Sequence, residues 1–218
     1  MENEYAYPPP MHPAVRAGAR FVSYVFHPVF LPIYVIAYLI FIHPYSYASL
    51  QEKQKLMKLV SFFILTVFFP TLTVFLLWRL KFVESIKLRT QQERIIPYIA
   101  SIIYFFWAWY VSKNQTENPL ILVSFLLGLF LTTSAALMAN SYFKISMHAL
   151  GVGGVLAFMV LIGLYTFDPM GVPISIATII AGLVCTARLA VSDHHPVEII
   201  WGFLIGILFQ VIACVIVL

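Results

Sequence analysis

Three short clusters in an otherwise apolar chain contain the residues best suited to chemistry. Their ionisable and hydroxyl side chains belong to Lys87, Arg94, Ser146, His148, Arg188, His194 and Glu198. Fixed cations suit a phosphoryl group and the negative charge that develops on it during transfer. An imidazole can serve beside them as nucleophile, general acid or general base. These residue types therefore indicate chemistry on a phosphate.

The spacing within each cluster suggests how its members meet. Lys87 and Arg94 are seven residues apart, which on a helix is two turns and places both on one face. The segment around His148 opens an apolar run, and the backbone N–H groups of a helix start bind anions. His194 and Glu198 are four residues apart, so on a helix they are neighbours. A carboxylate on one imidazole nitrogen orients the ring and leaves the other nitrogen for attack.

Spacing alone leaves the choice of histidine in the third cluster open. His195 lies three residues before Glu198, so it too could reach that carboxylate. Asp193 could also orient a histidine. Two earlier histidines, His27 and His43, each precede a proline, and we expect both to have interfacial or helix-bonding roles outside the site.

Composition identifies the elements that must position these clusters. Hydrophobic types make up 61% of the 218 residues and charged types 10%, whereas about 25% is usual in soluble domains. This excludes a soluble globular domain, a disordered chain and a disulfide scaffold. The net charge of +4 is spread without a dense basic run, so no nucleic-acid partner is expected. Because the apolar runs are continuous rather than alternating, they predict helices instead of a barrel.

We therefore predict an all-α polytopic membrane bundle of six or seven transmembrane helices. Residues 1–20 form a polar N-terminal tail, and residues 21–218 form a single transmembrane domain. Each of the seven stretches without Asp, Glu, Lys or Arg has at least 18 residues, which suffices to cross a bilayer. The stretches are Phe21–Gln51, Leu59–Trp78, Ile95–Ser112, Asn118–Phe143, Ile145–Phe167, Pro169–Ala187 and Ile199–Leu218.

The number of crossings decides whether the clusters can meet. Two apolar runs separate the first cluster from the second, and two more separate the second from the third. If every run crosses, all three clusters lie on one side of the membrane and can form a single site. The loss of one crossing would destroy this convergence. Pro28, Pro32 and Pro70 lie within runs and predict kinks or breaks.

The three clusters resemble the signatures of the type 2 phosphatidic acid phosphatase (PAP2) superfamily, relatives of vanadium haloperoxidases. That family shows K-x6-R-P, then P-S-G-H, then S-R-x5-H-x3-D. The matching residues here are Lys87 and Arg94, then Ser146 and His148, then Arg188, His194 and Glu198. The resemblance covers residues 87–198, about half of the chain.

The sequence departs from these signatures at several positions. The proline of the first signature is displaced to Pro97, and Glu198 replaces the final aspartate. Ile145 and Met147 replace the proline and glycine of the second signature, and Ala187 replaces the serine of the third. Methionine still offers a backbone N–H but lacks the conformational freedom of glycine. The chain therefore resembles a divergent member of the family.

The resemblance implies a haloperoxidase-like helical core and a lipid phosphatase that works without metal or cofactor through a phosphohistidine. His194 would attack phosphorus, Glu198 would orient its ring, and His148 would protonate the departing oxygen and then activate water. The phosphate oxygens would be held by Lys87, Arg94, Ser146 and Arg188. Candidate substrates are polyprenyl diphosphate, phosphatidate, phosphatidylglycerophosphate and phosphorylated lipid A, and the sequence does not choose between them. Membrane lipids are the other expected partners, and no oligomeric state is predicted.

Two alternative functions keep the same fold. One is a phosphotransferase that passes phosphate from one lipid to another, and the other is an inactive relative that binds or transports lipid. The resemblance favours a bacterial inner-membrane protein with its site on the extracytoplasmic face. Outside the proposed site, six basic residues fall on the site side and four on the opposite side. By the positive-inside rule this count favours the cytoplasmic face instead.

Overall fold

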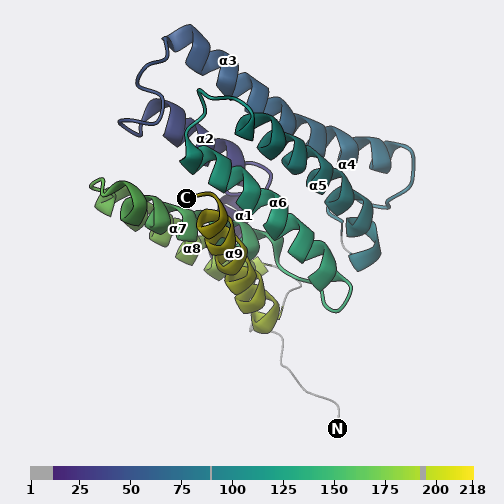
Figure 1. The fold of residues 1–218 in the computed structure, drawn as a ribbon. Helices are drawn as coiled ribbons and strands as arrows, with labels where there is room; N and C mark the ends of the chain where they lie inside the picture. Colours follow the sequence, from purple (N-terminus) through teal and green to yellow (C-terminus); the bar gives the residue numbers. More distant parts are fainter. Residues whose placement is uncertain (1–11, 89, 192–194) are drawn as a thin grey trace.

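The computed structural model describes residues 12–88, 90–191 and 195–218, and all regular secondary structure in them is helical. This confirms the predicted all-α fold (Figure 1). Three consecutive segments, α3, a π-helical turn η1 and α4, form one continuous helix from Glu52 to Arg79. The elements are α1 Pro13–Val25, α2 Leu31–Phe41, α3 Glu52–Phe63, η1 Ile64–Phe68, α4 Phe69–Arg79, α5 Gln91–Lys113, α6 Leu120–Asn140, α7 Met147–Thr166, α8 Gly171–Val191 and α9 Pro196–Val217.

Six helices of the described chain are long and apolar enough to cross a membrane, which identifies an integral membrane protein. They are the continuous α3–η1–α4 helix and α5, α6, α7, α8 and α9. The first predicted run, Phe21–Gln51, is not one of them, because it is divided between α1 and α2.

The division follows from the sequence at residues 26–30. Pro28 has no N–H to donate and disfavours helical geometry at the residue before it, and here the helix ends before this point. A short turn replaces it, in which the Phe30 N–H donates to the His27 carbonyl at 2.8 Å. The predicted break at Pro28 is therefore confirmed.

The two pieces together still carry the chain from one end of the bundle to the other. α1 packs on α8, where Val22 and Phe26 contact the cluster around Val184. α2 leads to His43, whose Nε2 lies 3.3 Å from Asp168 Oδ2 in the loop between α7 and α8. The first run therefore connects the two ends of the bundle in two segments, as the parity of seven runs requires.

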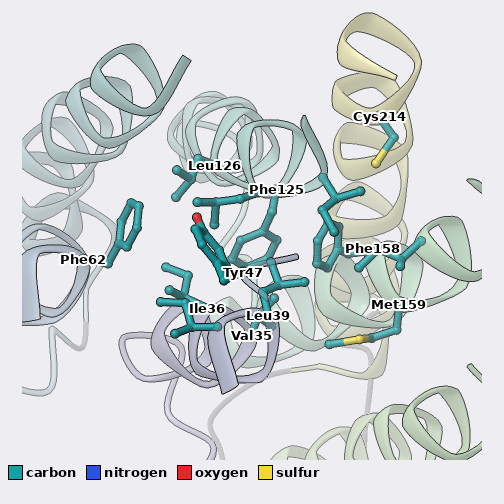
Figure 2. Packing of buried hydrophobic residues seen from close by; sticks show 14 of the residues in the cluster. Val35, Ile36, Leu39, Tyr47, Phe62, Phe125, Leu126, Phe158, Met159 and Cys214 are labelled. Atoms are coloured by element: carbon teal, nitrogen blue, oxygen red, sulfur yellow. The ribbon is translucent and has the colours of Figure 1, made fainter. Parts of the chain in front are cut away.

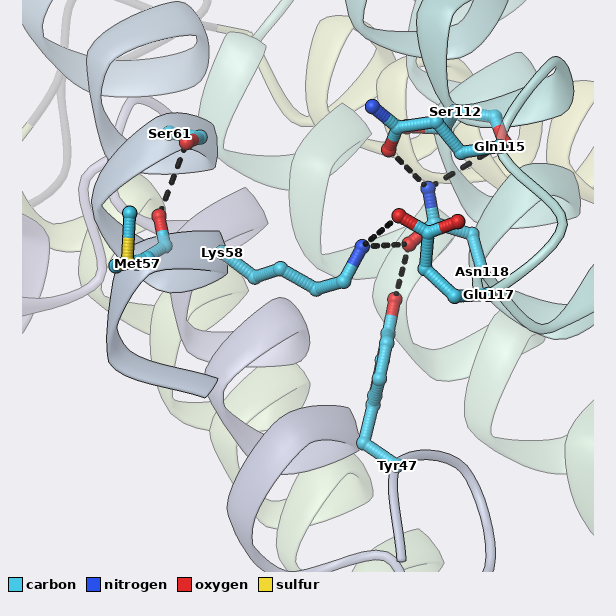
Figure 3. Close-up of polar contacts among 8 residues, drawn as sticks. All are labelled: Tyr47, Met57, Lys58, Ser61, Ser112, Gln115, Glu117 and Asn118. Atoms are coloured by element: carbon cyan, nitrogen blue, oxygen red, sulfur yellow. Dashed lines mark hydrogen bonds and ion pairs between the residues drawn. The ribbon is translucent and has the colours of Figure 1, made fainter. Parts of the chain in front are cut away.

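Polar contacts tie the connecting segments together at the end of the bundle that we call the far end (Figure 3). The Lys58 ammonium donates to Glu117 at 3.3 Å and to Asn118 at 2.9 Å. The Tyr47 hydroxyl donates to the same Asn118 oxygen at 2.9 Å. Hydrogen bonds from its own backbone and from Lys58 lower the pKa of the Glu117 carboxyl. Burial, with Glu117 nearby, raises the pKa of Tyr47, so its hydroxyl remains a donor at neutral pH.

The opposite end, which we call the site end, is closed by contacts between the α5 start, the α6 end and the segment that leads into α7. The Gln91 amide donates to the Asn140 carbonyl at 2.7 Å, and the Asn140 amide donates back to the Gln91 carbonyl at 2.9 Å. The Ser146 N–H donates to the Glu198 carbonyl at 3.4 Å, which adds the start of α9. The described residues of all three sequence clusters therefore lie at this one end.

The main core lies toward the far half of the bundle, between α2, α6 and α7. Phe125 and Phe158 form its centre, with ring centroids 4.7 Å apart (Figure 2). Ile36 and Leu39 of α2 pack on them and are fully buried. This packing holds α2 in place although it is too short to cross alone.

α7 and α9 approach each other until their backbones touch. A Cβ built on Gly206 would lie 2.1 Å from the Leu150 carbonyl oxygen, and one on Gly153 would lie 2.3 Å from the Phe203 carbonyl oxygen. A Cβ on Gly202 would lie 2.8 Å from the Ser146 carbonyl oxygen. These distances leave no space for a methyl group, so small residues at the interface set the separation of the two helices.

We expect Gly206→Ala to destabilise the protein by about 1–3 kcal/mol, because the new methyl must push α7 away from α9. Gly182→Ala is the matched control, since its Cβ would meet nothing within 4 Å. Thermal unfolding in detergent should show a lower midpoint for Gly206→Ala and no loss for Gly182→Ala. Equal midpoints for the two variants would contradict the tight packing described here.

Candidate functional site

A cavity of about 510 Å³ opens at the site end and extends between the helices. This is within the usual range of roughly 300–1,000 Å³ for pockets that bind small molecules. Five of its lining residues carry a positive charge or an imidazole, and the lining otherwise is mostly apolar. The five are His27, Lys87, Arg94, His148 and Arg188.

Lys87 and Arg94 both line the cavity, although not in the way that their spacing predicts. Lys87 lies in a turn, and α5 begins only at Gln91, so the two residues do not share a helical face. The predicted helix across both residues is therefore wrong. The turn is held by Glu93, whose carboxylate accepts the backbone N–H groups of Glu84, Ser85 and Thr90.

Arg94 connects the first cluster to the second. Its Nε donates to the Leu88 carbonyl at 3.0 Å, and its Nη1 donates to the Ile145 carbonyl at 3.0 Å. These bonds use two of the five N–H donors of the guanidinium. Arg94 therefore braces the loop that holds Lys87 against the segment that leads into α7, while it also lines the cavity.

His148 lies in the first turn of α7 and contacts the end of α1. Its Nε2 is 3.0 Å from the Ser23 carbonyl oxygen. A carbonyl can only accept, so Nε2 carries a proton in this contact. In the neutral ring the lone pair is then on Nδ1, and in the protonated ring Nδ1 carries the second proton.

His27 is a member of the site that the sequence interpretation missed. It lines the cavity, and its ring is perpendicular to that of His148 with centroids 5.2 Å apart. The Val29 N–H donates to its Nδ1 at 3.3 Å, which fixes the ring at the break between α1 and α2. The available signal was the pair His27-Pro28 inside an apolar run, because a helix break within a membrane protein often lines a cavity.

Arg188 joins the site from the last turn of α8. A cation is favoured at this position because the carbonyl end of a helix carries partial negative charge. The side chain is half-buried and reaches the same cavity as His27 and His148. The three cations of the cavity thus come from a loop, from the start of α5 and from the end of α8.

Ser146 and Glu198 take part in holding the site end together. Ser146 is fully buried as the residue before α7, and it is not among the residues that line the cavity. The Glu198 carboxylate accepts the His195 backbone N–H at 3.1 Å, which caps α9. His194, the predicted nucleophile, and Asp193 lie outside the described residues. The predicted contact between His194 and Glu198 therefore stays a prediction.

Within the described residues, no group of three or more His, Cys, Asp or Glu side chains is arranged to hold a metal ion. Cys185 and Cys214 are unpaired thiols in α8 and α9. What the cavity offers instead is a set of cations and imidazoles at one end, which suits an anion.

Comparisons with protein-family models, curated proteins and solved structures gave no match to this chain.

We expect His148→Phe to loosen α1 from the bundle, because the phenyl ring keeps the shape of imidazole but cannot donate to the Ser23 carbonyl. A buried carbonyl left without its donor costs about 1–3 kcal/mol. Limited proteolysis should cut residues 12–30 faster in this variant, and the thermal midpoint should fall. His148→Gln retains a donor and should lose less. If the two variants behave alike, the contact between His148 and Ser23 does not hold α1.

Proposed function

We propose that the protein removes the phosphate group from a membrane lipid phosphate or diphosphate bound in this cavity. The observation that carries the proposal is the gathering of Lys87, Arg94 and Arg188 around one cavity with His148. Two long helices, α5 and α6, separate the pair Lys87 and Arg94 from His148 in the sequence, and α7 and α8 separate His148 from Arg188. A membrane protein tolerates such a concentration of charge mainly where it serves function.

The rest of the cavity supports a lipid rather than a soluble phosphate. Away from the cations the lining is mostly apolar and includes Val74, Phe75, Phe105 and Leu129. A ligand that fills this space needs an anionic head and a hydrocarbon body. Lipid phosphates have this composition, and their headgroups lie at the depth of the helix ends.

The reaction follows from the residue types, with roles taken from the resemblance. A ring nitrogen of His194 attacks phosphorus, and the bond between phosphorus and the lipid oxygen breaks. His148 in its protonated form gives the Nδ1 proton to that oxygen, while Nε2–H remains on the Ser23 carbonyl. His148 then takes a proton from water as the water attacks phosphorus and the bond to His194 breaks.

The cations stabilise the transferring group. Lys87, Arg94 and Arg188 offer donors at the cavity, and Arg94 is held in place by its bonds to the Leu88 and Ile145 carbonyls. A donor held in place before the reaction needs little reorganisation as negative charge grows on the phosphate oxygens. Ser146 is a buried residue at the start of α7 outside the cavity lining, so its proposed contribution comes from the backbone N–H groups that follow it rather than from its side chain. By the resemblance, we place the site on the extracytoplasmic face of a bacterial inner membrane.

We expect purified protein in detergent to release inorganic phosphate from at least one member of a panel of lipid phosphates. Arg188→Ala and His148→Ala should each lower the rate about 10²–10³-fold, the usual effect of losing one group that stabilises or protonates the transition state. Lys144→Ala is the matched control, because Lys144 is a cation at the site end that does not line the cavity. It should keep the wild-type rate within about twofold.

The outcomes of this assay separate the candidate functions. No release from any lipid by folded protein would overturn the phosphatase proposal. Transfer of labelled phosphate to a second lipid without release into water would identify a phosphotransferase instead. Equal loss in Lys144→Ala and Arg188→Ala would show that overall charge, rather than the cavity, determines the rate.

We also expect rapid quenching of the reaction with labelled lipid phosphate to trap an acid-labile phosphoprotein. His194→Ala should abolish the label, because it removes the nitrogen that is proposed to bond to phosphorus. His195→Ala should retain it and is the control for the neighbouring imidazole. Loss of label in His195→Ala with normal label in His194→Ala would assign the nucleophile to His195.

A further inference from the structure

The cavity reaches far along the helices from the site end. Its deepest lining residues include Phe105 of α5, Phe125 of α6 and Gln210 of α9. Phe105 lies 14 residues after the start of α5 at Gln91, and Gln210 lies 14 residues after the start of α9 at Pro196. At about 1.5 Å per residue, both positions are roughly 21 Å along their helices from the site end. The hydrocarbon core of a bilayer is about 30 Å thick, so the cavity extends past its middle.

The length of the cavity restricts what can fill it. Carbon–carbon bonds are about 1.5 Å long, so an extended zigzag hydrocarbon chain advances roughly 1.25 Å per carbon atom. A path of roughly 21 Å along the helices therefore corresponds to a chain of about 15 to 20 carbon atoms.

Three polar residues of the deep lining are compatible with a hydrocarbon occupant, because they make hydrogen bonds within the protein. The Thr66 hydroxyl donates to the Phe62 carbonyl and the Thr133 hydroxyl to the Leu129 carbonyl, each at 2.8 Å. Such bonds turn the hydroxyl toward its own helix. The Gln210 amide donates to the Ser124 carbonyl at 3.4 Å and packs closely against Gly128.

We propose that the protein selects lipid phosphates by the length of a hydrocarbon chain of about 15 to 20 carbon atoms, which lies inside this cavity with its end at Phe105, Phe125 and Gln210. The inference rests on the proposed function for the placement of the phosphate among Lys87, Arg94 and Arg188. A shorter chain leaves part of the cavity empty, which loses packing contacts. A longer chain must bend or displace the side chains at the deep end, which costs packing free energy.

The test is a binding series of straight-chain monoalkyl phosphates of about 8 to about 24 carbon atoms, each competing with a fluorescent hexadecyl phosphate on the full chain in detergent. Wild-type protein should bind best at about 15 to 20 carbons, and the longest phosphate should bind roughly tenfold more weakly than the best one. Because binding is measured without turnover, the result does not depend on catalysis.

Two variants move the end of the cavity in opposite directions. Leu129→Trp places a larger side chain in the deep part and should shift the best length downward by several carbons. Phe105→Ala enlarges the same part and should shift the best length upward. Leu183→Trp is the matched control, because Leu183 is half exposed on α8 and does not line the cavity.

The possible results separate this inference from the proposed function. A binding profile that is flat, or that is unchanged in Leu129→Trp, overturns the inference even if phosphate is released normally. A peaked profile that shifts in both variants supports the inference. The same peaked and shifted profile without phosphate release from any lipid supports selection by chain length and overturns the phosphatase proposal. If Phe105→Ala does not fold, Leu129→Trp and its control still decide the question.

Discussion

The close backbone contact between α7 and α9 is the constraint on which the site end depends. Gly202 and Gly206 allow α9 to lie against the carbonyl groups of Ser146 and Leu150, at distances where any side chain would collide. This contact fixes the start of α7, and with it His148, beside the start of α9. In a bilayer, burial of apolar area does not drive helices together, so such close packing is a main source of attraction. The position of an imidazole in the cavity thus follows from glycines that never touch the ligand.

The loops at the site end are held in place by hydrogen bonds to backbone carbonyl groups that would otherwise lack partners. Arg94 satisfies the carbonyls of Leu88 and Ile145, and Gln91 and Asn140 satisfy each other's carbonyls. An unpaired backbone group in this environment costs several kcal/mol, so these bonds fix the loops firmly. Arg94 therefore has a structural and a proposed phosphate-binding role at the same time, and loss of its side chain would affect both.

The helical class and the break at Pro28 could be predicted from the sequence, because they follow from continuous hydropathy and from the N–H that proline lacks. The number of crossings likewise predicted that the described residues of the three clusters lie at one end of the bundle. It did not predict that Lys87 lies in a turn, because Glu93 stops the helix by capping α5 at Thr90. His27 was missed because its approach to His148 depends on how α1 packs on α8, which no local pattern encodes. Likewise, spacing could not reveal that Ser146 would be buried behind the cavity lining.

The π-helical turn η1 has a consequence for the evolution of this chain. In it the Phe69 N–H donates to the Ile64 carbonyl, five residues earlier, so the turn contains one residue more than an α-helical turn. Pro70 follows directly, and both Thr66 and Pro70 face the cavity. Deletion of one residue here would restore a regular helix and rotate α4 by about 100° relative to α3. A single-residue deletion would therefore turn the Pro70 side of α4 toward lipid, so this helix can tolerate substitutions more readily than changes in length.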